Sequence, residues 1–492
     1  MKKKLLVLLP IVLTYLGTTG YIANNIENKS QKIIKRLEAK YADMGLSVEA
    51  TFKDKSFFTS QMDLVVDVKN AQSKGRLSAF YQLPIVLHYK VEHGPLLFRD
   101  GMGIGMVGLS MDTSLSQILE SSLVDRLKLK ETDMMIHSTS QVSFGKNISS
   151  IMDVSGWKLA NKEMNMNIDI APFMMTSDMN LEHMTGKMQW TVPSLKMSDF
   201  KQDMKHIELE EMTAKLRIDS WVSKDIYLGK VNLVAKRFHL KNKEDKTDID
   251  LGMAFDVLMG ENRDKDLKVI YTISGNNINA TVPNENFGSP LKNGYFSLKT
   301  SIDGLSPTGM QKFQDYMTKI QEKRDLVLST DQNNSANMAA YLAESQNISR
   351  DIFILAQEIF TEKKAKIGLD LKLGKENDDV LSAKADFAYQ AEVVRGTVNE
   401  MSEAFVQNLF TSLFAQIDVS LKASFWESIK AVSPADKKQS MEMGLQMAMG
   451  TGMIVKKGDN YTLNVDYSPN KLTINGTDKS GDLLMIKGKF VK

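Results

Sequence analysis

The sequence predicts an α+β protein dominated by β-structure: an elongated antiparallel sheet or sandwich, with helices inserted in its second half, preceded by an N-terminal transmembrane helix. Three observations support this fold class. Leu5–Ala23 carries no charge and follows three lysines. From Leu46 to about residue 305, apolar and polar residues alternate, which is typical of half-buried strands. After Ser306, apolar residues recur at helical spacing in several segments.

The uncharged segment Leu5–Ala23 is long enough for a tilted helix to cross the roughly 30 Å of bilayer hydrocarbon. The basic tip, residues 1–4, keeps the N-terminus in the cytoplasm under the positive-inside rule. A removed signal peptide is the alternative, for which Thr18 and Gly20 are the passable small pair. Both interpretations predict export of the rest of the chain, and the poor cleavage site favours a retained anchor.

The composition limits the class of protein. Lys and Arg number 62 and Asp and Glu 60, so the net charge of +2 gives no field that would attract nucleic acid. The hydrophobic share of 42% is ordinary for a globular protein. The absence of cysteine excludes disulfides and thiolate metal sites.

The elements follow in order after the anchor. Residues 24–45 are expected to form a stalk helix that ends at Gly45, and residues 46–305 a β-rich region. That region opens with LSVEATFK and FFTSQMDLVVDVKN, two alternating runs joined by a turn at residues 53–56. Strand following strand through short polar links favours antiparallel pairing over βαβ units.

Residues 306–492 are expected to mix helices and strands. Ser306 is placed as the N-cap of a helix with Pro307 in its first turn. Further helices are expected at 336–360, at 399–417 before a short strand 418–425, and from Pro434 onwards. The chain closes with a predicted hairpin around Ser468-Pro-Asn.

Histidine and glycine residues form the patterns in which chemistry could lie. Glu92 and His93 are adjacent on a strand and therefore point to opposite faces, so a turn at His93-Gly-Pro is favoured over a catalytic or metal-binding pair. The other five histidines show no catalytic or metal-binding spacing. Gly103-Ile-Gly-Met-Val-Gly108 fits G-x-G-x-x-G but lacks the βαβ context of a dinucleotide site, which favours strand glycines.

Methionine is frequent, with 31 residues. Such side chains serve as adaptable core filler, as soft ligands for Cu(I), or as the lining of a groove for acyl chains or helices. The clusters are Met164, Met166, Met174 and Met175, and then Met441, Met443, Met447, Met449 and Met453. No histidine falls at matching ligand spacing, which disfavours copper.

Short segments in a fixed order carry a family resemblance: FFTSQ from Phe57, VEHGP from Val91, Phe287-Gly-Ser, Leu298, IDG from Ile302, and LTING from Leu472. With them the chain resembles, over nearly its whole length, the YdgA/YihF-like family of bacterial envelope proteins, whose biochemical role is not established. The resemblance implies a protein anchored in the inner membrane of a Gram-negative cell, with most of the chain in the periplasm. It implies no catalytic residue. The family-motif positions of unassigned role are Phe57, Ser60, Gln61, Glu92, His93, Gly94, Pro95, Asp303, Gly304, Asn475 and Gly476.

The function expected from these observations is a non-enzymatic, membrane-anchored envelope protein that presents a β-rich surface to a lipid or another envelope component. No cofactor, metal or nucleic acid is expected. Two alternatives stay open: an envelope hydrolase whose site is assembled from distant residues, and a structural subunit that associates into homo-oligomers.

Overall fold

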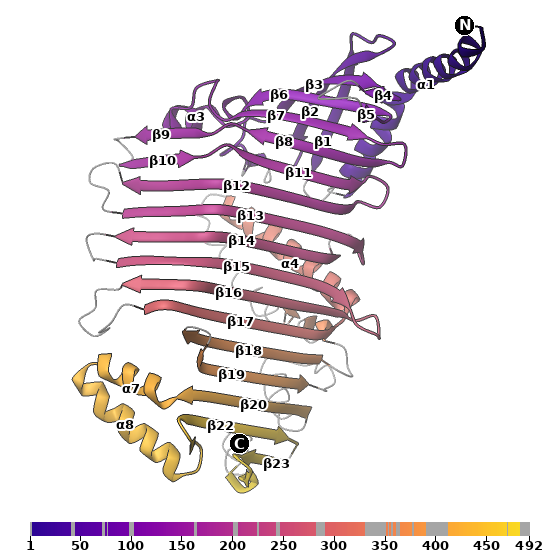
Figure 1. Ribbon diagram of the computed structural model, residues 1–492. Helices are drawn as coiled ribbons and strands as arrows, with labels where there is room; N and C mark the ends of the chain where they lie inside the picture. The colour runs from indigo at the N-terminus through magenta and orange to yellow at the C-terminus, as the bar shows by residue number, and fades with distance from the viewer. Residues whose placement is uncertain are drawn as a thin grey trace. The chain divides into compact units, whose positions relative to one another are not determined.

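The protein was analysed as a computed structural model. The structure describes residues 2–40, 45–70, 74–75, 77–97, 103–161, 165–199, 205–223, 226–242, 247–281, 291–329, 351–352, 354–355, 358–360, 365–375, 378–389, 412–469 and 471–482. Figure 1 shows the chain coloured by residue number. Its contacts divide it into two compact units, Met1–Ser220 and Trp221–Lys492. This division falls inside the predicted β-rich region 46–305, and each unit is described by itself.

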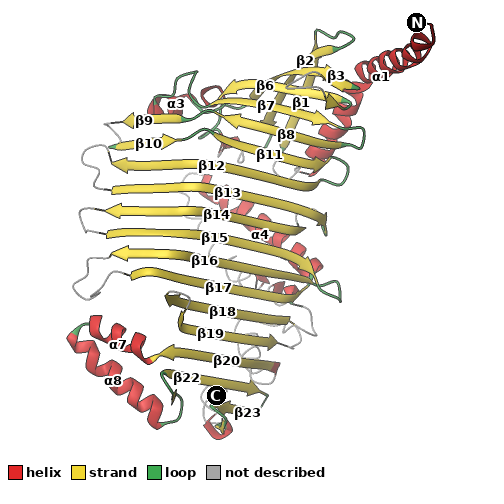
Figure 2. Cartoon of the chain, viewed as in Figure 1, coloured by secondary structure: helices red, strands yellow, loops and turns green. Residues whose placement is uncertain are grey.

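Unit 1 is an antiparallel sheet in which most neighbours along the chain pair (Figure 2). In spatial order its strands are β1 (Leu46–Lys53), β2 (Thr59–Val68), β3 (Ile85–His93), β6 (Val107–Ser114), β7 (Met135–Val142), β8 (Asn147–Val154), β11 (Phe173–Asn180), β12 (Thr185–Asp199) and β13 (Lys205–Trp221). Strand β10 (Met166–Ile170) also pairs with β12 and carries β9 (Trp157–Asn161). A separate pair, β4 (Leu96–Leu97) and β5 (Gly103–Ile104), and the short helices η2 (Leu115–Gln117) and α3 (Ser121–Leu127) complete the unit.

Helix α1 (Lys2–Lys40) packs two isoleucines of its second half onto this sheet. Ile26 and Ile34 are buried in one cluster with Ala50, Met62 and Val91 of β1, β2 and β3. The residues predicted as a stalk therefore supply part of the core of unit 1.

The predicted transmembrane helix at the N-terminus is wrong. Among the residues that the structure describes, no helix combines the length and the apolar character needed to span a bilayer. The end of the uncharged segment Leu5–Ala23 is instead packed within unit 1, where Thr19 is fully buried and Ile22 is 5% exposed. The ring of Phe57 lies so close to Gly20 that an added Cβ would meet it at 3.1 Å.

Unit 2 is an antiparallel meander. Its strands pair in the order β14 (Tyr227–Asn242), β15 (Thr247–Glu261), β16 (Leu267–Thr281), β17 (Leu291–Leu305), β18 (Ala365–Lys375), β19 (Asp378–Tyr389), β20 (Leu413–Lys422), β22 (Asn460–Ser468), β23 (Lys471–Ile474) and β24 (Thr477–Asp478). The short β21 (Val455–Lys457) also pairs with β22. Helix α4 (Pro307–Ser329) lies between β17 and β18 in the chain, and α7 (Ala423–Val432) and α8 (Ala435–Gly450) follow β20.

Local signals in unit 2 are largely confirmed. The Ser306 hydroxyl accepts the N–H of Gly309 at 3.0 Å, as the predicted N-cap requires. The closing hairpin forms, with Ser468 opposite Lys471. The predicted helix 399–417 is wrong in its described part, because β20 already begins at Leu413, where its residues continue the alternation that pairs with β19. The predicted strand 418–425 is confirmed over 418–422 and ends early, since helix α7 begins at Ala423. Most of the predicted helix 336–360 and residues 399–411 lie outside the described residues.

Candidate functional site

The motif positions of unit 1 meet where β2 begins and β3 ends. Antiparallel pairing places Ser60 opposite Val91. The backbone N–H of His93 donates to the carbonyl of Phe58 at 2.8 Å. Two motifs that are separate in the sequence thus form one corner of the sheet.

Ser60 and His93 form a buried hydrogen bond. Oγ of Ser60 lies 3.1 Å from Nε2 of His93, and Nδ1 of the ring lies 3.2 Å from the carbonyl oxygen of Phe57. The consistent protonation has Nδ1–H donating to the carbonyl and the hydroxyl donating to Nε2. Burial lowers the pKa of His93 below 6.5 and outweighs the opposing effect of the Phe57 carbonyl, so the ring is neutral at pH 7.

This pair differs from a serine nucleophile with its base in two respects. Nδ1 faces a main-chain carbonyl where a triad has a carboxylate. Ser60 and His93 are each only 2% exposed. A nearby pocket of about 330 Å³ is lined by Ser60 as well as by Gln61 and Lys90. Gln61 and Lys90 pair on the strand face opposite to the one that carries the Ser60 side chain. The arrangement is that of a structural hydrogen bond in the core.

Beside this corner the backbones of two segments approach so closely that glycine is required. Gly105 N–H donates to the carbonyl of Pro95 at 2.9 Å, and a Cβ added to Gly94 would lie 1.7 Å from the carbonyl oxygen of Gly105. Gly103 and Gly108 of the G-x-G-x-x-G pattern lie in β5 and β6, away from any strand-to-helix junction of the βαβ type. Gly103 and Gly108 are therefore strand glycines, as predicted, whereas Gly105 lies in the bend between β5 and β6.

Asp303 and Gly304 lie at the end of β17 in unit 2. The Asp303 carboxylate accepts from Asn262 Nδ2 at 2.9 Å and pairs with Lys268 Nζ at 3.3 Å. Burial opposes ionisation of Asp303, but these hydrogen bonds prevail and lower its pKa. Gly304 has φ of +83°, which favours glycine. The Phe287 segment of the same resemblance lies outside the described residues.

Asn475 and Gly476 form the turn after β23, with φ of 49° and 81°. The Asn475 amide donates to the carbonyls of Gly452 and Met453, both at 2.9 Å, and its Oδ1 accepts the N–H of Asn464 at 2.8 Å. This side chain therefore fastens the segment after α8 to the final hairpin.

Neighbouring strands carry a set of histidine–aspartate pairs that the sequence did not predict. His88 Nδ1 lies 2.7 Å from Asp63, and His137 Nδ1 lies 2.6 Å from Asp112. In unit 2, His239 Nε2 lies 2.9 Å from an oxygen of Asp248. The partners in the first two pairs are 25 residues apart, so only a prediction of strand register could have found them.

The two faces of the unit 2 sheet have opposite chemistry. Residues directly opposite one another on neighbouring strands share a face. One row, here called the apolar row, crosses eight strands as Leu233, Phe255, Ile273, Leu298, Leu371, Ala383, Val419 and Leu463. On each strand, the sequence neighbour on one side of the apolar-row residue belongs to a polar row on the other face: Asn232, Asp256, Thr272, Lys299, Asp370, Lys384, Asp418 and Asn464.

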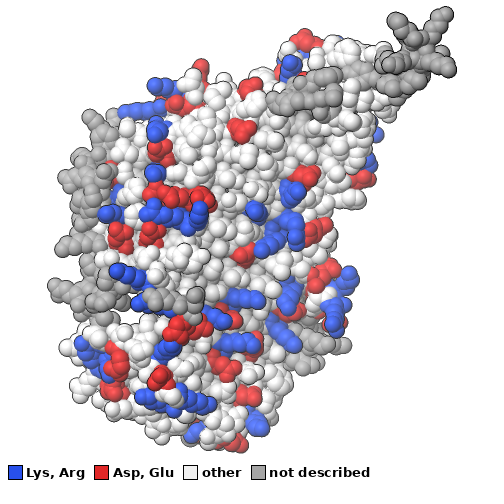
Figure 3. Space-filling view, in the orientation of Figure 1, with Lys and Arg blue, Asp and Glu red and all other residues white. Residues whose placement is uncertain are grey.

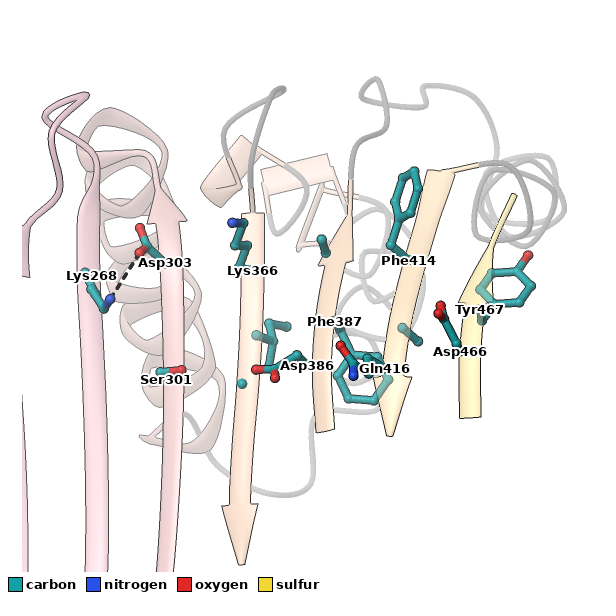
Figure 4. A pocket seen from close by; sticks show the side chains of 14 residues that line it. Lys268, Ser301, Asp303, Lys366, Asp386, Phe387, Phe414, Gln416, Asp466 and Tyr467 are labelled. Carbon is teal, nitrogen blue, oxygen red and sulfur yellow. Dashed lines mark ion pairs between the residues drawn. The ribbon is translucent and has the colours of Figure 1, made fainter. Parts of the chain in front are cut away.

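The polar face is mixed in charge and is hollowed by a pocket of about 440 Å³ (Figure 4). Gly368 leaves room at its floor, since an added Cβ would lie 2.6 Å from Ser301 Oγ and 3.1 Å from an oxygen of Asp386. Lys268 and Asp303 form an ion pair at its side. Figure 3 shows basic and acidic side chains interspersed over the strands of unit 2 on the face towards the viewer.

The apolar face is covered only in part. Helix α4, which lies behind the strands in Figure 1, brings Met310 against a cluster that includes Val269, and Val269 is 2% exposed. In the apolar row, by contrast, Leu233 is 37% and Ile273 is 38% exposed. Among the described residues, part of this face is therefore accessible at Leu233 and Ile273.

The methionine clusters separate into core and surface. Met166 packs against the core cluster around Trp157, whereas Met174 is 40% exposed. On and after α8, Met443, Met447, Met449 and Met453 are exposed. Met164 lies outside the described residues.

The chain was compared with known protein families, curated proteins and solved structures. The profile of a bacterial family of unknown function, DUF945, matches residues 1–480. Neither a curated protein nor a solved structure matches the chain. Since the matched region covers nearly the whole sequence, the chain belongs to the bacterial DUF945 family, whose function is unknown.

Proposed function

We propose that this chain is a non-enzymatic binding protein of the bacterial cell envelope, and that unit 2 holds the acyl chains of a lipid on the apolar face of its sheet. The observation that carries the proposal is the apolar row, which is unbroken over eight strands while the adjacent row is polar throughout. Covering apolar surface gains roughly 25 cal/mol per Å². The partly exposed side chains of this row, Leu233 and Ile273 above all, therefore favour an apolar ligand.

The dimensions suit an acyl chain. Eight strands at a spacing of about 4.8 Å give a row of about 34 Å. One leaflet of bilayer hydrocarbon, which an acyl chain crosses, is about 15 Å thick, half of the roughly 30 Å core. A chain lying along the row would contact several strands at once.

The location in the envelope rests on the N-terminal sequence and the resemblance to YdgA/YihF-like proteins. Lys2, Lys3 and Lys4 precede the uncharged segment, a pattern that directs export. Assignment to the YdgA/YihF-like branch of the family, with the chain in the periplasm, is part of the proposal. A hydrolase has weaker support, because His93 meets a serine but faces a carbonyl and is buried.

The test is lipid analysis of the full chain purified under mild conditions. Mass spectrometry should detect co-purifying lipid in the wild type, and Ile273→Glu should reduce it several-fold by placing a charge in the apolar row. Thr272→Glu, one residue away on the polar face, is the matched control and should retain the lipid. Absence of lipid in the wild type, or equal loss in both variants, would overturn the proposal.

A further inference from the structure

Helix α8 of unit 2 exposes methionines that the core does not use. Met443 and Met447 are 53% and 65% exposed, and Met453, just beyond the helix, is 51% exposed. Met443 and Met447 are four residues apart and so lie on one face of the helix. Leu445 points to the other side of the helix and is 7% exposed, so that side packs inward.

The exposed methionine face is a ridge that stands clear of its surroundings. A Cβ added to Gly444 or to Gly450 would have no other heavy atom within 4 Å. The helix is held from behind: Lys430 of α7 pairs with Glu442 at 2.9 Å, and Asn475 binds the carbonyls of Gly452 and Met453. The ridge is therefore a fixed and convex apolar feature.

Lysines lie at both ends of this ridge. Lys437 and Lys438 are exposed in the first turns of α8, and Lys456 and Lys457 are exposed in β21. The acidic residues of the same segment are Asp436 and Glu442, and Glu442 is already paired with Lys430. The segment thus offers a cationic rim around flexible apolar side chains.

We propose that the ridge of α8 and its lysine rim dock unit 2 onto an anionic lipid bilayer. Methionines would enter the interface between headgroups and acyl chains, and each lysine near the surface would add to the attraction for anionic lipid. A deformable bilayer fits a convex ridge, whereas recognition of a partner helix requires a groove. The proposal does not depend on acyl-chain binding by the apolar row.

Flotation of the full chain with vesicles tests the docking. Phosphatidylcholine vesicles with added phosphatidylglycerol should bind the wild type, and the binding should weaken with salt. The variant Met443→Glu/Met447→Glu should bind these vesicles roughly tenfold more weakly, and so should Lys437→Glu/Lys438→Glu. The matched control, Met135→Glu/Met174→Glu, alters two methionines of unit 1 that are also exposed, at 38% and 40%, and should bind as the wild type does.

A local readout separates this contact from any contribution of the N-terminal segment. Hydrogen exchange with vesicles present should slow in residues 439–453 of the wild type and be unchanged there in Met443→Glu/Met447→Glu. Equal flotation of this variant and the wild type, or no slowing at α8, would overturn the proposal. Light scattering would also overturn it if the wild type formed a dimer through this ridge, that is, a dimer that Met443→Glu/Met447→Glu does not form. If Ile273→Glu lost its co-purified lipid but still floated with the vesicles, that result would report on ligand binding by the apolar row, and the docking by α8 would stand.

Discussion

Ser60 Oγ lies 3.1 Å from Nε2 of His93 and joins the beginning of β2 to the last residue of β3. Both side chains are buried, so removal of either would leave a polar group without its partner in the core. The bond therefore gives two of the family-motif positions a structural role.

We expect His93 to make unit 1 sensitive to acid. The pKa of His93 is lowered in the folded state by burial, so the unfolded chain takes up its proton at higher pH. The stability that the neutral ring contributes is complete above the unfolded pKa of about 6.5 and is lost as the pH falls towards the folded pKa. Urea unfolding between about pH 7.5 and pH 5 measures this loss. His93→Gln, which does not titrate, should show a flatter dependence, and identical curves would contradict the assignment.

We expect Gly94→Ala to destabilise unit 1 by about 3 kcal/mol, because the new Cβ would overlap the Gly105 carbonyl. Thermal unfolding followed by circular dichroism measures the change. Gly444→Ala provides the opposite case, since its Cβ would project into open space on a helix and should stabilise α8 by about 1 kcal/mol. A tolerated Gly94→Ala would show that the corner can open.

We expect Ile34→Ala to cost about 3 kcal/mol, as a buried isoleucine does when its cavity stays open. Ile34 is 7% exposed in the cluster between α1 and the sheet. Lys35→Ala, at an exposed neighbouring position, should change stability by less than about 0.5 kcal/mol. Equal unfolding free energies in the two variants would mean that α1 is not part of the core.

We expect Asn475→Ala to cost about 2 kcal/mol, because it leaves the Gly452 and Met453 carbonyls without their amide donor. Hydrogen exchange should then accelerate at residues 451–454 before the rest of unit 2. Asn475→Gly, which keeps the positive φ but removes the amide, should also accelerate exchange there. Protection as in the wild type would assign the role of Asn475 to its backbone conformation alone.

Features that depend on local pattern were predictable. The run LSVEATFK became β1 with the predicted bounds, and Ser306 caps α4, because alternation and capping are properties of a few adjacent residues. The Ser60–His93 bond was not predictable, since its partners are 33 residues apart and meet only through the pairing of β2 with β3. The transmembrane helix was wrongly predicted because an apolar stretch has the same composition whether it faces lipid or a protein core.

The sequence by itself determined that this chain forms antiparallel strands, and its alternation assigned neighbouring residues such as Thr272 and Ile273 to opposite faces. Only the tertiary structure decided which residues lie opposite one another and so aligned single apolar residues into a row across unit 2. It also decided that α4 covers Val269 while Ile273 stays accessible. The physical reason is that side-chain direction follows from the backbone of one strand, whereas register and coverage arise from contacts between segments far apart in the chain.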